Sequence, residues 1–324
     1  MKKSILNIAV LGVGNMGRHH ARVFAEMDGV NLVAVVDTDK KKGTRIARQH
    51  NCHYYHDIRK MFRDEQINAA SIAVPTSLHK SIALQCLTHG IPVLIEKPIA
   101  DTLASARSII AMSKKKKLPV CIGHIERYNP VVQRLKKIVG KKRFGKIITI
   151  NTKRVGTFPP QITDVDVIID LAVHDIDVCN YLLGRQPQRV YARAGRAMNS
   201  RQLDYADIFL SYQDTDVILQ VNWITPVKVR ELTLTGIKAY AELNYMTQAL
   251  HIYNKGHGEE DDIVNIESIN IRKEEPLKRQ LKNFIQYITT KKGDVVTAQE
   301  GFQVLKTAQC AVASHRKGQS IPIR

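Results

Sequence analysis

Three ionisable residues in this sequence have the types and spacing needed for acid–base chemistry on an alcohol. Lys97 lies in the Glu-Lys-Pro triplet at 96–98, directly after the apolar run 92–95, which reads as a buried strand. Asp170 and His174 are four residues apart, so on a helix they share one face. A carboxylate orients a neighbouring imidazole and raises its basicity, and a lysine can stabilise charge developing on the reacting oxygen. These three residues are the predicted catalytic set, with a buried ion pair as the alternative for Asp170 and His174.

A glycine-rich loop near the start of the chain indicates where a dinucleotide binds. Gly12, Gly14 and Gly17 follow the strand-like segment 5–11 and precede a helix-like segment, which is the context that this motif requires. The glycines permit a tight turn, close approach of the phosphates and close helix packing, and the helix N-terminus attracts a pyrophosphate. Asp37 ends the next strand-like segment, where its carboxylate can accept both ribose hydroxyls and repel a 2′-phosphate. This predicts NAD rather than NADP.

Residues at the ends of other predicted strands complete the predicted cofactor site. In a doubly wound sheet, ligands bind in the crevice beyond the carboxyl ends of the strands. The further residues predicted to contact NAD are Asn15, Met16, Pro75, Thr76, His79, Glu96 and Lys97. For His79, an ordinary histidine on a helix face is an equal alternative.

The predicted substrate site uses side chains that follow two other strand ends. Its residues are Arg127, Tyr128, Asn129, Arg154, Asp170 and His174. Segment 123–130 offers hydrogen bonds to a polyol or a phosphate, with a structural hinge as the alternative. Arg154 leaves a later strand-like segment, and a guanidinium group in that position is suited to binding phosphate.

The order of strand-like and helix-like segments predicts an α/β protein with two domains. Residues 1–122 alternate strand and helix, which is typical of a parallel Rossmann sheet that binds NAD. Residues 123–324 contain successive strands without intervening helices, which predicts a mixed, largely antiparallel, open-faced sheet with helices on one face. This second domain is expected to bind substrate and to oligomerise, with the last helix free to pack back on the first domain. The alternating apolar residues of 217–223 are expected on the face that meets another copy.

The amino-acid composition indicates which binding partners and which cellular compartment to expect. The formal net charge is +19, yet no aromatic residues interleave with the lysine runs, so a solvated basic surface is favoured over nucleic-acid binding, with attraction of anionic substrates second. The five cysteines are scattered without a Cys-x-x-Cys pair, so neither disulfides nor zinc is predicted. His50, His53 and His56 do not stay on one face, so no metal is expected there. Without a membrane span or a signal peptide, a cytoplasmic protein is expected.

Together these motifs resemble one family of oxidoreductases. The glycine loop at 12–17, the triplet at 96–98 and the Asp-x-x-x-His-x-x-Asp pattern at 170–177 are similar to those of the glucose–fructose oxidoreductase/inositol dehydrogenase/rhizopine catabolism (Gfo/Idh/MocA) family. The resemblance covers essentially the whole chain. It implies NAD(P), a Rossmann domain, a sugar-binding sheet domain that forms homodimers or homotetramers, and the same lysine–aspartate–histidine catalytic set. Ala172 stands where the family often has glycine, which narrows the space near the substrate.

Within the family, segments 123–130 and 166–177 are most similar to enzymes that oxidise the 3-hydroxyl of UDP-N-acetylglucosamine. That similarity implies a nucleotide-sugar substrate, a lipid A precursor pathway and functional pairing with a pyridoxal-phosphate aminotransferase that acts on the keto product. One alternative is oxidation of a free polyol or sugar such as myo-inositol. In other classes, the alternatives are a non-catalytic NAD-sensing protein and a basic nucleic-acid binder. The intact catalytic set argues against a sensor, and either Lys97 or His174 can serve as the base.

Overall fold

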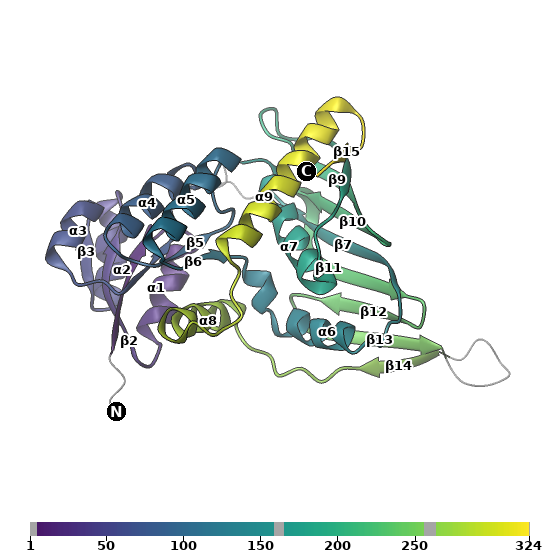
Figure 1. Cartoon of the computed structure of the whole chain (residues 1–324), viewed down its shortest axis with the longest axis horizontal. Helices are drawn as coiled ribbons and strands as arrows, with labels where there is room; N and C mark the ends of the chain where they lie inside the picture. Colours follow the sequence, from purple (N-terminus) through teal and green to yellow (C-terminus); the bar gives the residue numbers. More distant parts are fainter. Residues whose placement is uncertain (1–4, 159–164, 256–263, 324) are drawn as a thin grey trace. The chain divides into compact units, whose positions relative to one another are not determined.

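The computed structural model describes residues 5–158, 165–255 and 264–323 (Figure 1). The chain divides into two compact units, and each unit is formed from two segments of the sequence. Unit 1 comprises residues 1–124 and 277–302, and unit 2 comprises residues 125–276 and 303–324. Each unit is built around one β-sheet with helices packed on it.

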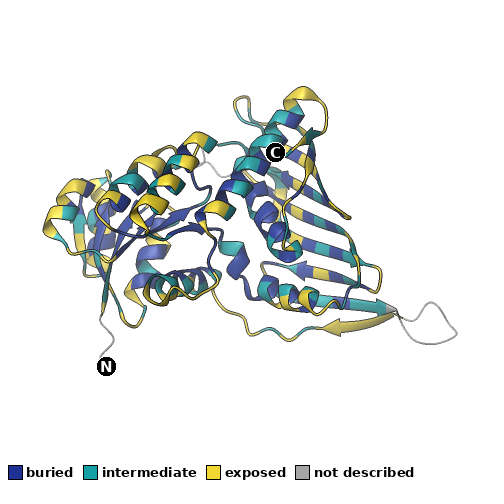
Figure 2. Ribbon diagram, viewed as in Figure 1, coloured by how far each residue is buried: buried dark blue, intermediate teal, exposed yellow. Residues whose placement is uncertain are grey.

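Unit 1 contains a six-stranded parallel sheet with the order β3-β2-β1-β4-β5-β6. Its strands are β1 (Leu6–Leu11), β2 (Val30–Val36), β3 (His53–Tyr55), β4 (Ala69–Ile72), β5 (Val93–Glu96) and β6 (Val120–Gly123). This order is that of the doubly wound dinucleotide-binding fold, which confirms the predicted Rossmann domain. Every residue of β4, β5 and β6 is buried (Figure 2), as expected when both faces of a parallel sheet are covered.

Several helices of unit 1 begin at a side chain that caps the first turn. The helices of this unit are α1 (Gly17–Ala25), α2 (Lys40–Gln49), α3 (Ile58–Asp64), α4 (His79–Thr88), α5 (Leu103–Lys116) and α8 (Pro276–Thr290). Asp39, Asp57 and Thr102 accept backbone N–H donors at the starts of α2, α3 and α5. No side chain caps α1 or α4.

The assignment of residues 277–302 to unit 1 differs from the prediction that all of 123–324 forms the second domain. The Ile122 N–H donates to the Val296 carbonyl oxygen at 2.8 Å, and Cys121 forms an isolated antiparallel bridge with Thr297. The returning chain therefore covers the β6 edge of the sheet, which would otherwise present unpaired backbone groups.

Unit 2 contains a nine-stranded sheet with the order β14-β13-β12-β11-β7-β10-β9-β8-β15. Its strands are β7 (Ile147–Thr157), β8 (Arg189–Gly195), β9 (Tyr205–Tyr212), β10 (Thr215–Asn222), β11 (Ile224–Gly236), β12 (Ala239–Asn244), β13 (Ala249–Lys255), β14 (Val264–Ser268) and β15 (Ile321–Pro322). Neighbouring strands are antiparallel except for the parallel pair β7 and β10. The predicted mixed, largely antiparallel sheet is thus confirmed.

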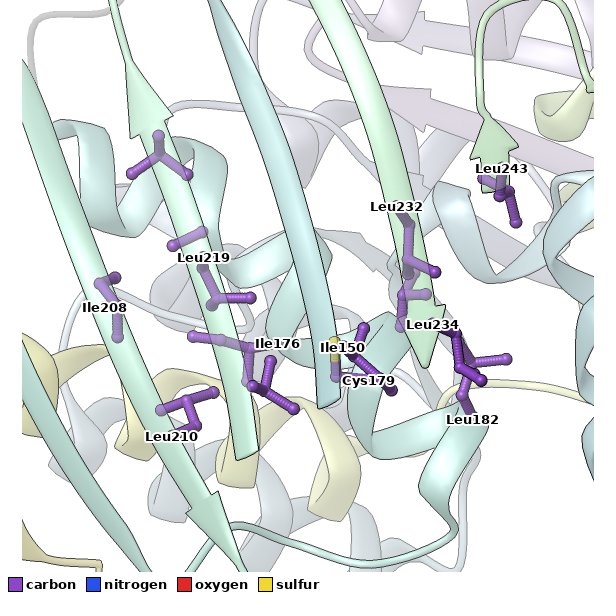
Figure 3. Close-up of a cluster of buried hydrophobic side chains, with 14 of the residues drawn as sticks. Ile150, Ile176, Cys179, Leu182, Ile208, Leu210, Leu219, Leu232, Leu234 and Leu243 are labelled. Atoms are coloured by element: carbon purple, nitrogen blue, oxygen red, sulfur yellow. The ribbon is translucent and has the colours of Figure 1, made fainter. Parts of the chain in front are cut away.

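The core of unit 2 lies between this sheet and its helices. These helices are α6 (Pro130–Gly140), α7 (Val173–Leu183) and the later part of α9 (Ala298–Lys317). Ile150 and Leu219 of the sheet gather with Ile176 and Cys179 of α7 (Figure 3), and all four side chains are fully buried. Burial of this apolar area, at ~25 cal/mol per Å², is the main contribution that holds α7 on the sheet.

The apolar alternation of β10 faces the helices, which corrects the expectation that it lines the open face. The four apolar residues that alternate through 217–223 are at most 3% exposed, whereas Gln220 between them is exposed. The open face carries other side chains, among them Phe209, which is 45% exposed and lies beside Tyr191. Apolar residues at every second position show that a strand has one apolar face, but they do not show which element covers that face.

Candidate active site

The glycine loop between β1 and α1 has the geometry that a phosphate-binding turn needs. Gly12 has a φ of +86°, and a Cβ there would lie 2.7 Å from the Ala73 carbonyl oxygen. A Cβ on Gly17 would lie 1.8 Å from the Gly12 carbonyl oxygen, so neither position accepts a side chain. At Gly14 no heavy atom lies within 4 Å of the Cβ position. Gly14 is therefore the position at which a phosphate can approach the backbone.

The N-terminus of α1 is open to an anion. Met16 at the N-cap makes no side-chain capping bond, and no acidic residue stands in the first turn. Amide donors at a helix N-terminus, together with the helix dipole, favour a negatively charged group. The loop, with Asn15 and Met16, thus fits the pyrophosphate of a dinucleotide.

Asp37 connects the end of β2 to the glycine loop. Its Oδ2 accepts the Val13 N–H at 2.8 Å, and its Oδ1 accepts the Asp39 N–H at 2.8 Å. Each carboxylate oxygen has lone pairs left for a ribose hydroxyl. Of the lysines at the start of α2, Lys42 pairs with Asp39 at 3.1 Å, so its charge is partly compensated. The geometry supports the predicted preference for NAD.

We expect the Asp37→Asn enzyme to lose discrimination against NADP. The amide keeps an acceptor for the loop but removes the charge that repels a 2′-phosphate. The ratio of kcat/KM for NAD to that for NADP should fall about tenfold or more, which corresponds to ~1.4 kcal/mol. Asp28→Asn, at an exposed acid of the same unit, is the matched control. A wild-type enzyme that favours NADP tenfold would contradict the role of Asp37.

His79 joins the turns that follow β4 and β5. Its Nδ1 lies 2.9 Å from the Pro98 carbonyl oxygen, and its Nε2 lies 3.0 Å from the Val74 carbonyl oxygen. The residue is 1% exposed, so it is not the exposed helix-face histidine of the alternative. Pro75 and Thr76 lie in the turn that His79 holds, at the start of the short 3₁₀ helix Thr76–Leu78. The ring thereby fixes two predicted cofactor-binding turns to each other.

A buried hydrogen-bond network is formed around Glu96, the residue that precedes Lys97. The Glu96 Oε1 is 3.0 Å from Nε2 of His20, and Nδ1 of His20 is 2.7 Å from the Ser71 hydroxyl oxygen. The Lys97 backbone N–H donates to the Glu96 Oε2 at 3.3 Å. Burial acts to raise the pKa of Glu96, but the hydrogen bond from His20 and nearby positive charge outweigh it and lower that pKa. Glu96 is therefore a buried carboxylate with a defined partner.

Neither His20 nor Ser71 was among the predicted site residues. A signal was present in the sequence, because His20 falls on the buried face of α1, whose other buried residues are Gly17, Ala21, Val23 and Phe24. A polar ring at such a position needs a hydrogen-bond partner. Ser71, in the middle of a buried strand, offered no comparable signal.

Replacing His20 with alanine should affect catalysis and stability together. The Glu96 carboxylate would keep its burial but lose its donor, which destabilises the protein by about 1–3 kcal/mol. We expect kcat to fall about tenfold through displacement of Lys97, with a smaller rise in the Kd for NAD because Glu96 and Lys97 are predicted cofactor contacts. Thermal unfolding, NAD titration and steady-state kinetics measure the three quantities. His56→Ala, at an exposed histidine of the same unit, is the control. If kcat per folded molecule is unaltered, His20 has no part in positioning Lys97.

In unit 2, Asp170 and His174 lie on one continuous helical segment that is not α-helical throughout. A π-helical turn spans Ile168–Ala172, and α7 follows directly. The sequence predicted a helix over 167–183, and the structure adds that its first turn is π-helical. A turn closed by i→i+5 hydrogen bonds still keeps residues four apart near one face, and such turns are frequent at functional sites. Asp170 is 7% exposed, and His174 is half-buried.

Two buried ion pairs anchor α7 immediately after His174. Nε and Nη2 of Arg154 each donate to the Asp175 carboxylate at 2.8 Å, and Nη1 donates to Glu126 at 3.0 Å. Nε of Arg127 donates to Asp177 at 3.1 Å, and its Nη2 makes the parallel bond. Although burial lowers the pKa of Arg154, the charges of Asp175 and Glu126 raise it well above its ordinary value.

These contacts change the assignment of the predicted substrate-binding residues. Arg127 and Arg154 are each 4% exposed, and their guanidinium groups are occupied by carboxylates. Asn129 caps α6 and donates to the Tyr245 carbonyl oxygen at 3.1 Å, and Tyr128 is 1% exposed. Arg127, Asn129 and Arg154 therefore each have a structural partner, and we do not carry these three residues forward as proposed substrate ligands.

Two general properties of the described residues complete the site description. Within residues 5–158, 165–255 and 264–323, no group of three or more potential ligand side chains is arranged to hold a metal ion. Over the same ranges, none of the helices is long and apolar enough to cross a membrane.

The parallel sheet of unit 1, its glycine loop and the carboxylate after β2 define a dinucleotide-dependent oxidoreductase with a second α/β unit. Comparison with protein families agrees. Residues 6–124 match the model described as "Oxidoreductase family, NAD-binding Rossmann fold", and residues 136–323 match the "Oxidoreductase family, C-terminal alpha/beta domain". The chain belongs to the Gfo/Idh/MocA family of oxidoreductases, and unit 1 is its NAD-binding domain.

Relatives in this family include enzymes with different substrates. The UDP-N-acetylglucosamine 3-dehydrogenase of Acidithiobacillus ferrooxidans is 28% identical over 306 residues, which cover 94% of this chain and 95% of that protein. Its solved structure has a TM-score of 0.87 at 27% identity, covering 95% of this chain and 97% of that chain. An inositol 2-dehydrogenase of Rubrobacter xylanophilus is 30% identical over 190 residues, or 57% of this chain and 54% of that protein.

Proposed function

We propose that this protein oxidises the 3-hydroxyl of UDP-N-acetylglucosamine to the 3-keto sugar with NAD. The proposal rests mainly on how much of the chain is covered by its similarity to one relative. A UDP-N-acetylglucosamine 3-dehydrogenase matches 94% of the chain, which necessarily includes most of unit 2, whereas the inositol 2-dehydrogenase matches 57%. Because unit 1 binds the cofactor, the substrate is distinguished mainly by unit 2, and similarity through unit 2 bears most directly on substrate choice.

The proposed mechanism uses the three predicted catalytic residues. Oxidation of an alcohol removes the proton of the hydroxyl group and a hydride from the carbon that bears this group. NAD, when bound, is the hydride acceptor. His174 removes the proton, and Asp170 orients the imidazole ring. Lys97 donates a hydrogen bond to the same oxygen and stabilises the developing alkoxide. The roles of Lys97 and His174 can be exchanged without changing the overall proton balance.

Three further features belong to this proposal. The protein acts as a homodimer or homotetramer through the open face of the unit 2 sheet, where Phe209 and Tyr191 provide apolar surface. Its keto product is the substrate of a pyridoxal-phosphate aminotransferase on the route to diamino sugars of lipid A, in the cytoplasm. The net charge of +19 favours the approach of a doubly charged nucleotide sugar.

A substrate screen tests the proposed function. With NAD and UDP-N-acetylglucosamine, NADH absorbance should rise, and a coupled aminotransferase should increase the yield by removing the keto sugar. Free N-acetylglucosamine should react poorly, because binding energy from the remote diphosphate helps to position the ring. Rapid oxidation of myo-inositol, with no reaction of the UDP-sugar, would favour the polyol dehydrogenase alternative.

Removal of the proposed base gives the second test. His174→Ala should lower kcat by roughly 10²–10⁴, the usual contribution of a general base, while the Kd for NAD stays constant. Because Asp170 acts through His174, Asp170→Asn should add little to the loss in the double variant. His251→Ala, on β13 of the same unit, serves as the control. Near-normal kcat in His174→Ala would reduce that histidine to a structural role.

A further inference from the structure

A cavity of about 470 Å³ lies wholly within unit 2 and is lined mainly by basic and polar side chains. Its lining residues are Val165, Asp166, Arg196, Arg201, Gln202, Leu203, His315 and Arg316. They come from three separate segments: the start of the helical segment that carries Asp170, the connection between β8 and β9, and the end of α9. A volume of this size is within the range of small-molecule sites.

The connection between β8 and β9 is held in a defined conformation. The Asp204 carboxylate accepts the N–H groups of Ala197, Met198 and Asn199 at 2.7–3.0 Å. In turn, the side-chain oxygen of Asn199 accepts the N–H of Arg201 at 2.9 Å. Gln202 Nε2 donates to the Val165 carbonyl oxygen at 2.5 Å, which joins the connection to the start of the helical segment. These bonds occupy the backbone of the connection and leave its arginine side chains available.

The cavity carries a net positive charge. In the part of the chain that the structure describes, the guanidinium groups of Arg196, Arg201 and Arg316 form no hydrogen bond or salt bridge. Asp166 is the acidic residue of the lining, and its Oδ1 accepts the Ile168 and Ile169 N–H groups at 3.0 and 3.1 Å. Three guanidinium groups against one carboxylate leave two positive charges, which equals the two negative charges of the diphosphate in a nucleotide sugar.

His315 adds a neutral donor to the same cavity. Its Nδ1 accepts the Ala194 N–H at 3.2 Å, so the proton of the neutral ring is assigned to Nε2. A donor N–H and several guanidinium groups are the side chains that bind phosphate oxygens, and arginine can do so through two parallel bonds. An apolar or cationic ligand would leave these donors without acceptors.

We propose that this cavity binds the diphosphate of the nucleotide-sugar substrate, an inference that rests on the proposed function. Asp166 stands just before the π-helical turn that carries Asp170, and His174 follows eight residues after Asp166. The cavity is therefore lined by the start of the same helical segment that carries the proposed base. The cavity thus replaces Arg127 and Arg154 as the source of phosphate ligands in unit 2.

The experiment measures binding of UDP and of inorganic pyrophosphate by calorimetry, and KM for UDP-N-acetylglucosamine, in Arg201→Ala and Arg316→Ala enzymes. Each substitution should weaken UDP binding and raise KM about ten- to a hundredfold, the usual effect of losing a charge-assisted hydrogen bond. Pyrophosphate should compete with UDP in the wild type. NAD affinity should stay constant, which also shows that the variants fold. Arg201→Lys should recover part of the loss, and Arg193→Ala, at an exposed position on β8 outside the cavity, should behave as wild type.

The possible outcomes distinguish failure of the cavity assignment from failure of the proposed function. Unchanged UDP affinity and KM in both alanine variants, with normal turnover of the UDP-sugar, would overturn the cavity assignment and leave the proposed function intact. If the wild type neither binds UDP nor oxidises the UDP-sugar but oxidises a free polyol, both proposals fail. Binding of pyrophosphate that does not compete with UDP but is lost in both alanine variants would identify the cavity as a site for a free anion and would also overturn the assignment.

Discussion

The buried ion pairs of unit 2 are the interactions on which the position of the proposed base, His174, depends. Asp175 and Asp177 are each at most 1% exposed, and each is held by one arginine. A buried carboxylate without a partner is strongly unfavourable, and loss of one member of such a pair costs about 3–5 kcal/mol. The pairs therefore restrict how far α7 can rotate or slide, and His174 stands one residue before the first of them.

Unit 1 follows the same scheme with different residues. Glu96 is 8% exposed, is paired with His20 and directly precedes Lys97, as Asp175 directly follows His174. In both units, a candidate catalytic residue is the sequence neighbour of a buried carboxylate with a fixed partner. The backbone on one side of each reactive group is thus held by strong interactions. Preorganisation of this kind keeps catalytic groups within the narrow tolerance that a reaction requires.

Local patterns were sufficient to predict most elements, the parallel sheet and the glycine loop, because each depends on residues close in sequence. The ion pairs of Arg127 and Arg154 were not predicted, for the opposite reason. Their partners lie 50 and 21 residues away, and no local pattern shows that a basic side chain will be neutralised there. The short helix α3 was not predicted, since its periodic signal is brief. The cavity residues could not be grouped from sequence, because three distant segments supply them.

The π-helical turn gives the Asp170 helix an unusual sensitivity to chain length. A π turn is commonly an α-helix that accommodates one additional residue, and each residue of an α-helix accounts for ~100° of rotation. Deleting one residue from 168–172 would permit a regular helix, yet α7 would remain fixed by Asp175 and Asp177. The rotation would then be transmitted toward the N-terminus, where Asp166 and the cavity wall would turn away from their present partners. A single-residue deletion would therefore leave the core of unit 2 and the position of His174 unchanged. It would alter the orientation of the arginine-lined cavity relative to His174.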